Sequence, residues 1–95
     1  MENIKLAKTI TYDGVEIKEL NLDFDSLTGQ DLLNAEKEAI ALNKSASPIK
    51  EFDKGYLSIV AAKAAGVSTD LMPLLGAKDF TKVTVQAQNF LLNEE

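Results

Sequence analysis

An Asp-Gly dipeptide at residues 13 and 14 separates two runs of alternating apolar and polar residues near the start of the chain. Asp and Gly both tolerate the positive φ angles that the two corner residues of a type I′ turn adopt. Alternation with a period of two is typical of a strand that has one buried face. The sequence therefore predicts an antiparallel hairpin with strands at about 4–12 and 15–24.

The alternation changes phase within the second strand. Val15 and Ile17 are apolar at odd positions, whereas the later apolar residues lie at even positions, namely Leu20, Leu22 and Phe24. Successive side chains of a strand point to opposite faces, so a phase change requires an irregularity in the pairing. We expect a bulge near residues 18–19, or two strand pieces that face different neighbours.

Helical spacing of the apolar residues replaces the alternation after Thr28. Thr28 can cap a helix N-terminus, and Asp31 lies three residues later, near the positive end of the helix dipole. A first helix is expected at about 29–43. Similar signals predict three more helical segments. The second helix begins at Ser47-Pro48 or at Asp53 and ends at Gly66. A short helical turn follows at 68–76, and the last helix is expected at 77–93.

These elements predict an α+β fold, with an N-terminal β-hairpin followed by a small helical bundle of three main helices and one short helical turn. With 95 residues the chain is expected to form a single domain (1–95), with the hairpin at 1–25 and the helical part at 26–95. The periodicity predicts a core of Ile10, Leu22, Leu33, Ile40, Phe52, Tyr56, Ile59, Val60, Phe80, Val83, Phe90 and Leu91.

Composition argues against several classes of function. The chain has no histidine, cysteine or arginine, and its ten basic residues are scattered lysines in a protein of net charge −5. Nucleic-acid binding requires clustered cations, and typical zinc or copper sites require His or Cys. The sequence shows no membrane-spanning run and no signal-peptide pattern. We therefore expect a protein that is not an enzyme, with no catalytic residues, no cofactor, no metal, and no nucleic-acid or membrane partner.

Three local patterns mimic chemical sites. The acidic stretch 23–29 resembles a calcium loop, but Thr28 stands where the loop requires glycine and Asn34 replaces the bidentate glutamate. Asp25-Ser26-Leu27 matches the attachment triplet of acyl carrier proteins, yet a hairpin precedes it in place of a long helix. Glu36 lies on an apolar helix face, where a glutamate usually packs its stem and keeps its carboxylate in water or beside a lysine. We favour a capped loop, an exposed serine and a helix-margin glutamate.

Two helices carry more apolar residues than one buried face needs. On the last helix, Val85 and Leu92 lie a heptad apart on the side opposite the core stripe. On the first helix, Leu42 and Ala35 are displaced from Leu33 and Ile40. The simpler interpretation is that these residues pack beneath the hairpin or are isolated exposed apolar residues, which are common. The alternative is a surface for self-association or for partner helices, formed by Val85, Leu92, Leu42, Ala35 and Glu36.

The order of the motifs resembles the tail assembly chaperones of tailed bacteriophages, in particular a small group with an N-terminal hairpin. The hairpin motif is matched by Lys8, Ile10, Asp13 and Gly14, followed by Glu19-Leu20-Asn21-Leu22. The entry to the first helix is matched by Thr28-Gly29-Gln30-Asp31-Leu32. The C-terminal motif is matched by Gly66, Val67, Leu71, Leu74, Asp79, Phe80, Val83 and Phe90. The resemblance spans essentially the whole chain, whereas residues 43–47 and the second helix depart from the pattern.

The resemblance implies a non-catalytic assembly factor of the host cytoplasm. Such proteins bind the long, helical, aggregation-prone tape-measure protein, help tail-tube proteins to polymerise around it, and are absent from the finished particle. They are often also made as a longer frameshifted form. A homo-oligomer is also expected. Two alternatives stay open: a structural head–tail or tail-completion component that is retained in the virion, and a small acidic carrier protein.

Overall fold

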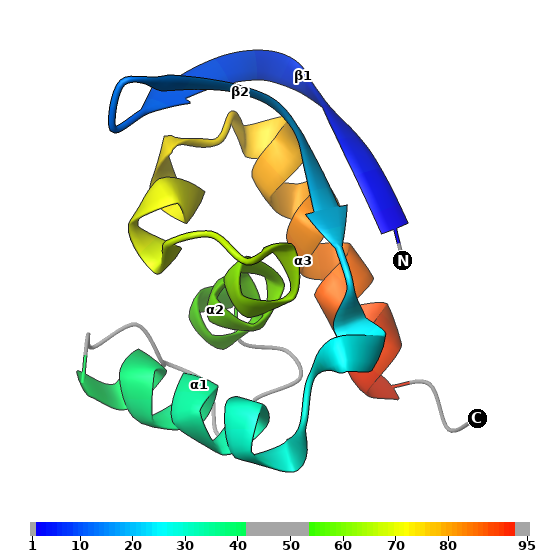
Figure 1. Ribbon diagram of the computed structural model, residues 1–95. Coiled ribbons are helices and arrows are strands. Elements are labelled where there is room, and N and C mark those ends of the chain that lie inside the picture. The colour runs from blue at the N-terminus through cyan, green and yellow to red at the C-terminus, as the bar shows by residue number, and fades with distance from the viewer. Residues whose placement is uncertain (1, 42–53, 93–95) are drawn as a thin grey trace.

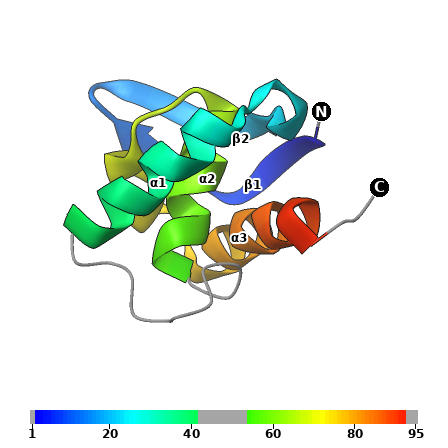
Figure 2. The same cartoon turned by 90° about the horizontal axis from the view of Figure 1, so that it is seen from below.

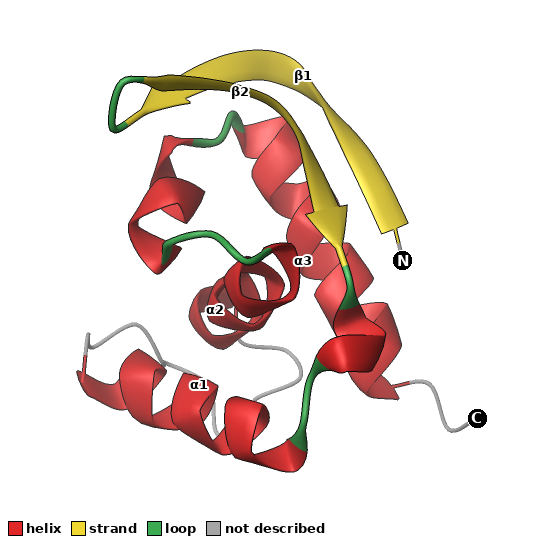
Figure 3. Cartoon of the chain, viewed as in Figure 1, coloured by secondary structure: helices red, strands yellow, loops and turns green. Residues whose placement is uncertain are grey.

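The computed structural model describes residues 2–41 and 54–92. An N-terminal antiparallel hairpin arches over a group of helices, which confirms the predicted α+β class (Figures 1 and 3). The elements in chain order are β1 (Glu2–Tyr12), β2 (Val15–Leu22), η1 (Phe24–Ser26), α1 (Gly29–Ala41), α2 (Lys54–Ala65), η3 (Thr69–Leu74) and α3 (Ala77–Leu92).

The hairpin turn has the expected geometry, because Asp13 and Gly14 both have positive φ angles of 53° and 78°. The strands differ slightly from their predicted bounds, since β1 already includes Glu2 and β2 ends at Leu22. The second strand ends early because the backbone N–H of Asp23 donates to the Ala64 carbonyl of α2, at 3.0 Å. Phe24, predicted as strand, therefore opens the short helix η1.

An irregularity divides the hairpin ladder at the predicted place. Lys5 pairs with Glu19 and Ile10 pairs with Ile17, so residues 6–9 of β1 face only Lys18 of β2. The extra residues belong to β1. They compensate for the change in β2 from apolar residues at odd positions (Ile17) to apolar residues at even positions (Leu20). Both halves of the hairpin consequently direct their large apolar side chains toward the helices, where four are buried, namely Ile4, Ile10, Leu20 and Leu22.

A single carboxylate holds the bulged segment against the helices. Asp79, in the first turn of α3, accepts hydrogen bonds from the backbone N–H groups of Ala7 at 2.9 Å and Lys8 at 3.1 Å. Its side chain is 1% exposed. Backbone N–H groups that are partly buried and lack a ladder partner need another acceptor. Asp79 supplies that acceptor, and it ties the first strand to the last helix.

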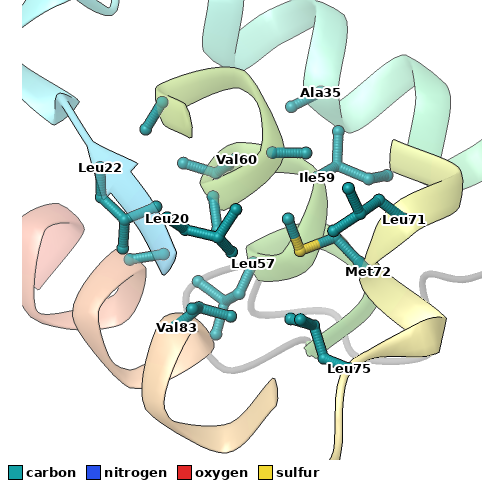
Figure 4. Packing of buried hydrophobic residues seen from close by; sticks show 14 of the residues in the cluster. Leu20, Leu22, Ala35, Leu57, Ile59, Val60, Leu71, Met72, Leu75 and Val83 are labelled. Atoms are coloured by element: carbon teal, nitrogen blue, oxygen red, sulfur yellow. The ribbon is translucent and has the colours of Figure 1, made fainter. Parts of the chain in front are cut away.

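Helix α2 forms the centre of the molecule and contacts the other elements on several sides. Eight of its twelve residues are buried. In Figure 4, the β2 residues Leu20 and Leu22 lie on one side of α2, while Leu71 and Met72 of η3 lie on the other. The two N-caps proposed for this helix, Ser47 and Asp53, lie outside the described residues.

The C-terminus of α2 is closed as the sequence predicts. Gly66 has a φ of 70°, and the N–H groups of Gly66 and Val67 donate to the carbonyls of Lys63 and Ala62. These two bonds form a Schellman motif. The next segment is a 3-10 helix, whose start is capped by the Ser68 hydroxyl, which accepts from the Asp70 N–H at 3.2 Å.

Part of the predicted core is wrong, and the error lies on α1. Leu33 and Ile40 are 57% and 61% exposed, whereas Ala35 and Ala39 are fully buried. Helix α1 packs on α2 through these small residues. Small side chains at a helix contact allow the two helix axes to lie closer together. With the alanines facing α2, Leu33 and Ile40 lie on the other side of α1 and face outward, while Leu32 is partly buried against the core.

The remaining core predictions agree with the structure to different extents. Six residues are buried, namely Ile10, Leu22, Tyr56, Ile59, Val60 and Val83. Three are partly buried against the core, namely Phe80, Phe90 and Leu91. Phe52 lies outside the described residues. The ring of Phe90 stacks on that of Phe24, with centroids 5.1 Å apart, so η1 is attached to α3.

Candidate functional site

The largest exposed aliphatic side chains of α1 form a pair on one side of the helix. Leu33 and Ile40 are separated by two turns, or about 10.5 Å along the axis, and therefore lie on the same face. We call them the α1 pair. Monomeric domains expose single apolar residues commonly, but two branched aliphatic residues in helical register form a surface that another helix can contact.

The start of α1 is fixed by reciprocal capping. The Thr28 N–H donates to Asp31 Oδ2 at 2.8 Å, and the Asp31 N–H donates to Thr28 Oγ1 at 3.2 Å. This arrangement is a capping box with aspartate in place of glutamate. On the side facing α2, Lys63 Nζ lies 3.6 Å from Glu38 Oε2. The buried alanines and these polar contacts hold α1 in the rotation that exposes the α1 pair.

Two residues proposed for a partner surface on α1 have different outcomes. Ala35 is fully buried against the core, so the prediction that it contacts a partner is wrong. Glu36 is half-buried and lies between the buried face of α1 and the α1 pair. Leu42 lies outside the described residues. Glu36 can therefore border a surface centred on Leu33 and Ile40.

The outer side of α3 carries the second pair, as the sequence predicts. Val85 is 41% exposed and Leu92 is 49% exposed, while Val83 and Ala87 on the opposite side are buried. We call Val85 and Leu92 the α3 pair. Helix α2 lies between α1 and α3 in both views of the molecule (Figures 1 and 2). The α1 pair and the α3 pair therefore lie on two separate outer helices and form two separate exposed surfaces.

An open recess of about 630 Å³ lies where the start of α2, the end of η3 and the start of α3 meet. Its lining is mostly apolar and includes Pro73, Leu75 and Phe80, with Lys54 at the start of α2. The hydroxyl of Ser58 donates to the Gly55 carbonyl at 2.8 Å, so that its proton is already in a hydrogen bond. The described lining offers no carboxylate to act as a base toward this serine.

The segments that mimic chemical sites have ordinary structural roles. Ser26, in the carrier-like triplet, is exposed, and its hydroxyl donates to the Asp23 carbonyl at 2.9 Å. The described residues contain no group of three or more His, Cys, Asp or Glu side chains placed to hold a metal ion. No helix in the described ranges is long and apolar enough to cross a membrane.

Comparisons with family models, with curated proteins and with solved structures gave no match to this chain. The geometry therefore provides the evidence for a site. Within the described residues it consists of two exposed apolar pairs on outer helices, one of which, the α1 pair, the sequence assigned to the core. The sequence of α1 carries no signal of its own for this rotation, because its apolar residues cover nearly half of the helix.

Proposed function

We propose that this protein is a non-catalytic tail assembly chaperone of a tailed bacteriophage or prophage, which binds helices of the tape-measure protein in the host cytoplasm. In this role it keeps the tape-measure protein soluble while tail-tube subunits polymerise around it. The order of motifs along the chain supports the proposal, from the hairpin at residues 8–22 through the helix entry at 28–32 to the C-terminal residues 66–90.

The observation that carries the proposal is the α1 pair. Leu33 and Ile40 are both more than half exposed and lie on one face of α1. An amphipathic helix that presents apolar residues at i, i+3, i+4 and i+7 can cover such a pair and bury its own apolar face at the same time. Binding to the α1 pair would bury the apolar face of the partner helix and so protect the partner from aggregation.

Charge favours a partner helix with basic margins. The chain has a net charge of −5, and Glu36 borders the α1 pair. Lysine or arginine residues beside the apolar stripe of the partner would meet this carboxylate and the acidic domain. Complementary charge raises the association rate and selects the binding orientation more than it raises affinity.

Co-expression with a tape-measure protein encoded beside this gene tests the proposal. We expect the partner to remain soluble and to co-purify with the wild-type protein. The variant Leu33→Gln with Ile40→Gln should reduce co-purification at least about tenfold, because truncation of a central apolar anchor typically costs more than about 1 kcal/mol of binding free energy. Glutamine preserves helix propensity, so circular dichroism should not change.

The hairpin supplies a matched control. Val15 is 61% exposed, as is Ile40, but it lies beside the β-turn and away from α1. Val15→Gln should leave co-purification unchanged. Equal capture by the Leu33→Gln and Ile40→Gln variant would refute the assignment of this surface. Recovery of the protein as a stoichiometric component of purified virions would instead support the structural head–tail alternative.

A further inference from the structure

The recess between the start of α2, the end of η3 and the start of α3 has the size of a small-molecule site. Its volume of about 630 Å³ falls within the range of roughly 300–1,000 Å³ that such sites occupy. The apolar part of its lining includes Pro73, Leu75 and Phe80, of which Leu75 is buried and Phe80 is half-buried. Small-molecule sites usually combine such apolar walls with a few polar groups that orient the ligand. The polar groups of the lining therefore indicate which ligand the recess fits.

The charge of the described lining is of one sign. Lys54 is its single charged residue, although the chain as a whole has fifteen acidic residues and ten lysines. Lys54 is exposed and forms no ion pair with another residue of the described ranges. A cation beside an apolar protein surface attracts an anion more strongly than a cation in open water does, because the effective dielectric constant is lower there. The recess therefore favours a ligand with a negative charge.

The two hydroxyl groups of the lining differ in their hydrogen bonding. The Ser58 hydroxyl already donates to the Gly55 carbonyl at 2.8 Å. The Thr81 carbonyl accepts from the Thr84 hydroxyl at 3.0 Å, whereas the exposed Thr81 hydroxyl makes no hydrogen bond to another described residue. Lys54 and Thr81 therefore supply free donors to the recess. An ionised carboxylate suits them, because it carries a negative charge and only accepts hydrogen bonds.

We propose that this recess binds an amphipathic carboxylate, namely the ionised form of a medium-chain fatty acid. The alkyl chain packs against Leu75 and Phe80, and the carboxylate accepts hydrogen bonds from Lys54 and Thr81. One lysine matches the single charge of a carboxylate, whereas phosphate recognition typically uses arginine, which the chain lacks. The described lining contains no residue of α1, so this site is separate from the α1 pair.

Titration of the isotope-labelled full chain with hexanoate, octanoate and decanoate, each below its micelle concentration, measures this binding by NMR. Saturable shifts should centre on the backbone amides of the recess. The Kd should fall about two- to fourfold for each added methylene, because each methylene removes further apolar surface from water. Ligands of this size bind with a Kd of about 1 mM or below, so the absence of saturable shifts at about 10 mM decanoate would overturn the proposal. Shifts confined to the α1 pair or the α3 pair would overturn it as well.

Exchange of the head group tests the role of Lys54. Lys54→Gln should weaken decanoate binding about three- to fivefold, the effect of a partly exposed ion pair, and should leave the binding of the neutral decanamide unchanged. Lys78 is exposed on α3 and lies outside the described lining, so Lys78→Gln provides the matched control and should bind decanoate like the wild type. Equal weakening by both variants, or equal affinity for decanoate and decyltrimethylammonium, would overturn the assignment of a carboxylate.

Filling the recess tests the place of the alkyl chain. Ala77 is an exposed residue of the lining, and Ala77→Leu should weaken decanoate binding at least about tenfold, because the added side chain takes space that the alkyl chain needs. Asn89→Leu, at an exposed position of α3 outside the described lining, should bind decanoate normally. Unchanged binding by Ala77→Leu would overturn the proposal.

Two further measurements separate this ligand from other occupants of the recess. The variant Leu33→Gln with Ile40→Gln should bind decanoate like the wild type, so loss of tape-measure binding and loss of carboxylate binding are distinguishable. If a second copy of the chain covers the recess instead, the same backbone amides should shift with protein concentration in the absence of ligand. That result would overturn the proposal.

Discussion

Helices α1 and α3 both lie against α2, and both expose an apolar pair two turns apart, but they are attached in different ways. Helix α3 inserts Val83 into the core, stacks Phe90 on Phe24 and binds the hairpin through Asp79. Helix α1 packs mainly through the fully buried Ala35 and Ala39, and Leu32 is only partly buried beside them. The comparison shows that a helix can be fixed by filling space with large side chains or by close approach through small ones. In the second case its large residues are left for other contacts.

The largest effect is expected where α3 meets the hairpin. Asp79→Ala removes the acceptor of two backbone N–H groups and should lower the free energy of unfolding by about 2–4 kcal/mol. Asp79→Asn keeps one acceptor oxygen and should cost about half as much. Urea unfolding followed by circular dichroism measures both variants. If Asp79→Ala is as stable as the wild type, the bulge does not depend on this carboxylate.

A somewhat smaller effect is expected at the other end of α3. Phe90→Ala removes a half-buried ring together with its stacking on Phe24, and it should cost about 2–3 kcal/mol. Asn89→Ala, at the exposed neighbouring position, should stay within about 0.5 kcal/mol of the wild type. Equal stability of both variants would show that the rotation of α3 differs from the one described.

On α1, stability is expected to be most sensitive to a larger side chain at a buried alanine. Ala35→Leu places a large side chain in the close contact with α2 and should cost about 1–3 kcal/mol. Ala41 is exposed on the same helix, so Ala41→Leu provides the control and should be nearly neutral. A stable Ala35→Leu protein would mean that α1 does not pack through its alanines, and the contrast with α3 would disappear.

The smallest effect is expected on the outer side of α1. Leu33→Ala combined with Ile40→Ala should change the stability of the isolated monomer by no more than about 0.5 kcal/mol for each residue, since both side chains are mostly exposed. Thermal unfolding at low protein concentration measures this difference. A loss of about 2–5 kcal/mol, the cost of truncating buried leucine or isoleucine, would place both residues in the core after all.

The features that the sequence predicts correctly depend on neighbours in the chain. The turn at Asp13-Gly14 follows from the φ preferences of two residues, and the bulge follows from a change of parity within one strand. The exposure of Val85 and Leu92 follows from the narrow stripe of large residues on the other side of α3. Each of these signals can be read within a single element.

The features that the sequence predicts wrongly depend on contacts with a second helix or strand. The apolar residues of α1 cover nearly half of the helix, so the sequence of α1 alone does not determine which half is buried. That choice depends on how closely α2 approaches, and it separates Ala35 in the core from Leu33 at the surface. The role of Asp79 was missed for a similar reason. An acidic residue in the first turn of a helix is common, and nothing local indicates that it binds a strand at the other end of the chain.

The bond between the bulge and Asp79 has a consequence for synthesis. Ala7 and Asp79 are separated by 72 positions, so the ribosome makes the two backbone donors well before it makes their acceptor. Until α3 has emerged, the nascent hairpin lacks its anchor, and long-range pairings of this kind close late in folding. The newly made first strand therefore lacks the acceptor of these two backbone N–H groups until α3 has been made. The attachment of the bulge to Asp79 therefore forms only after α3 is available to pack against the hairpin.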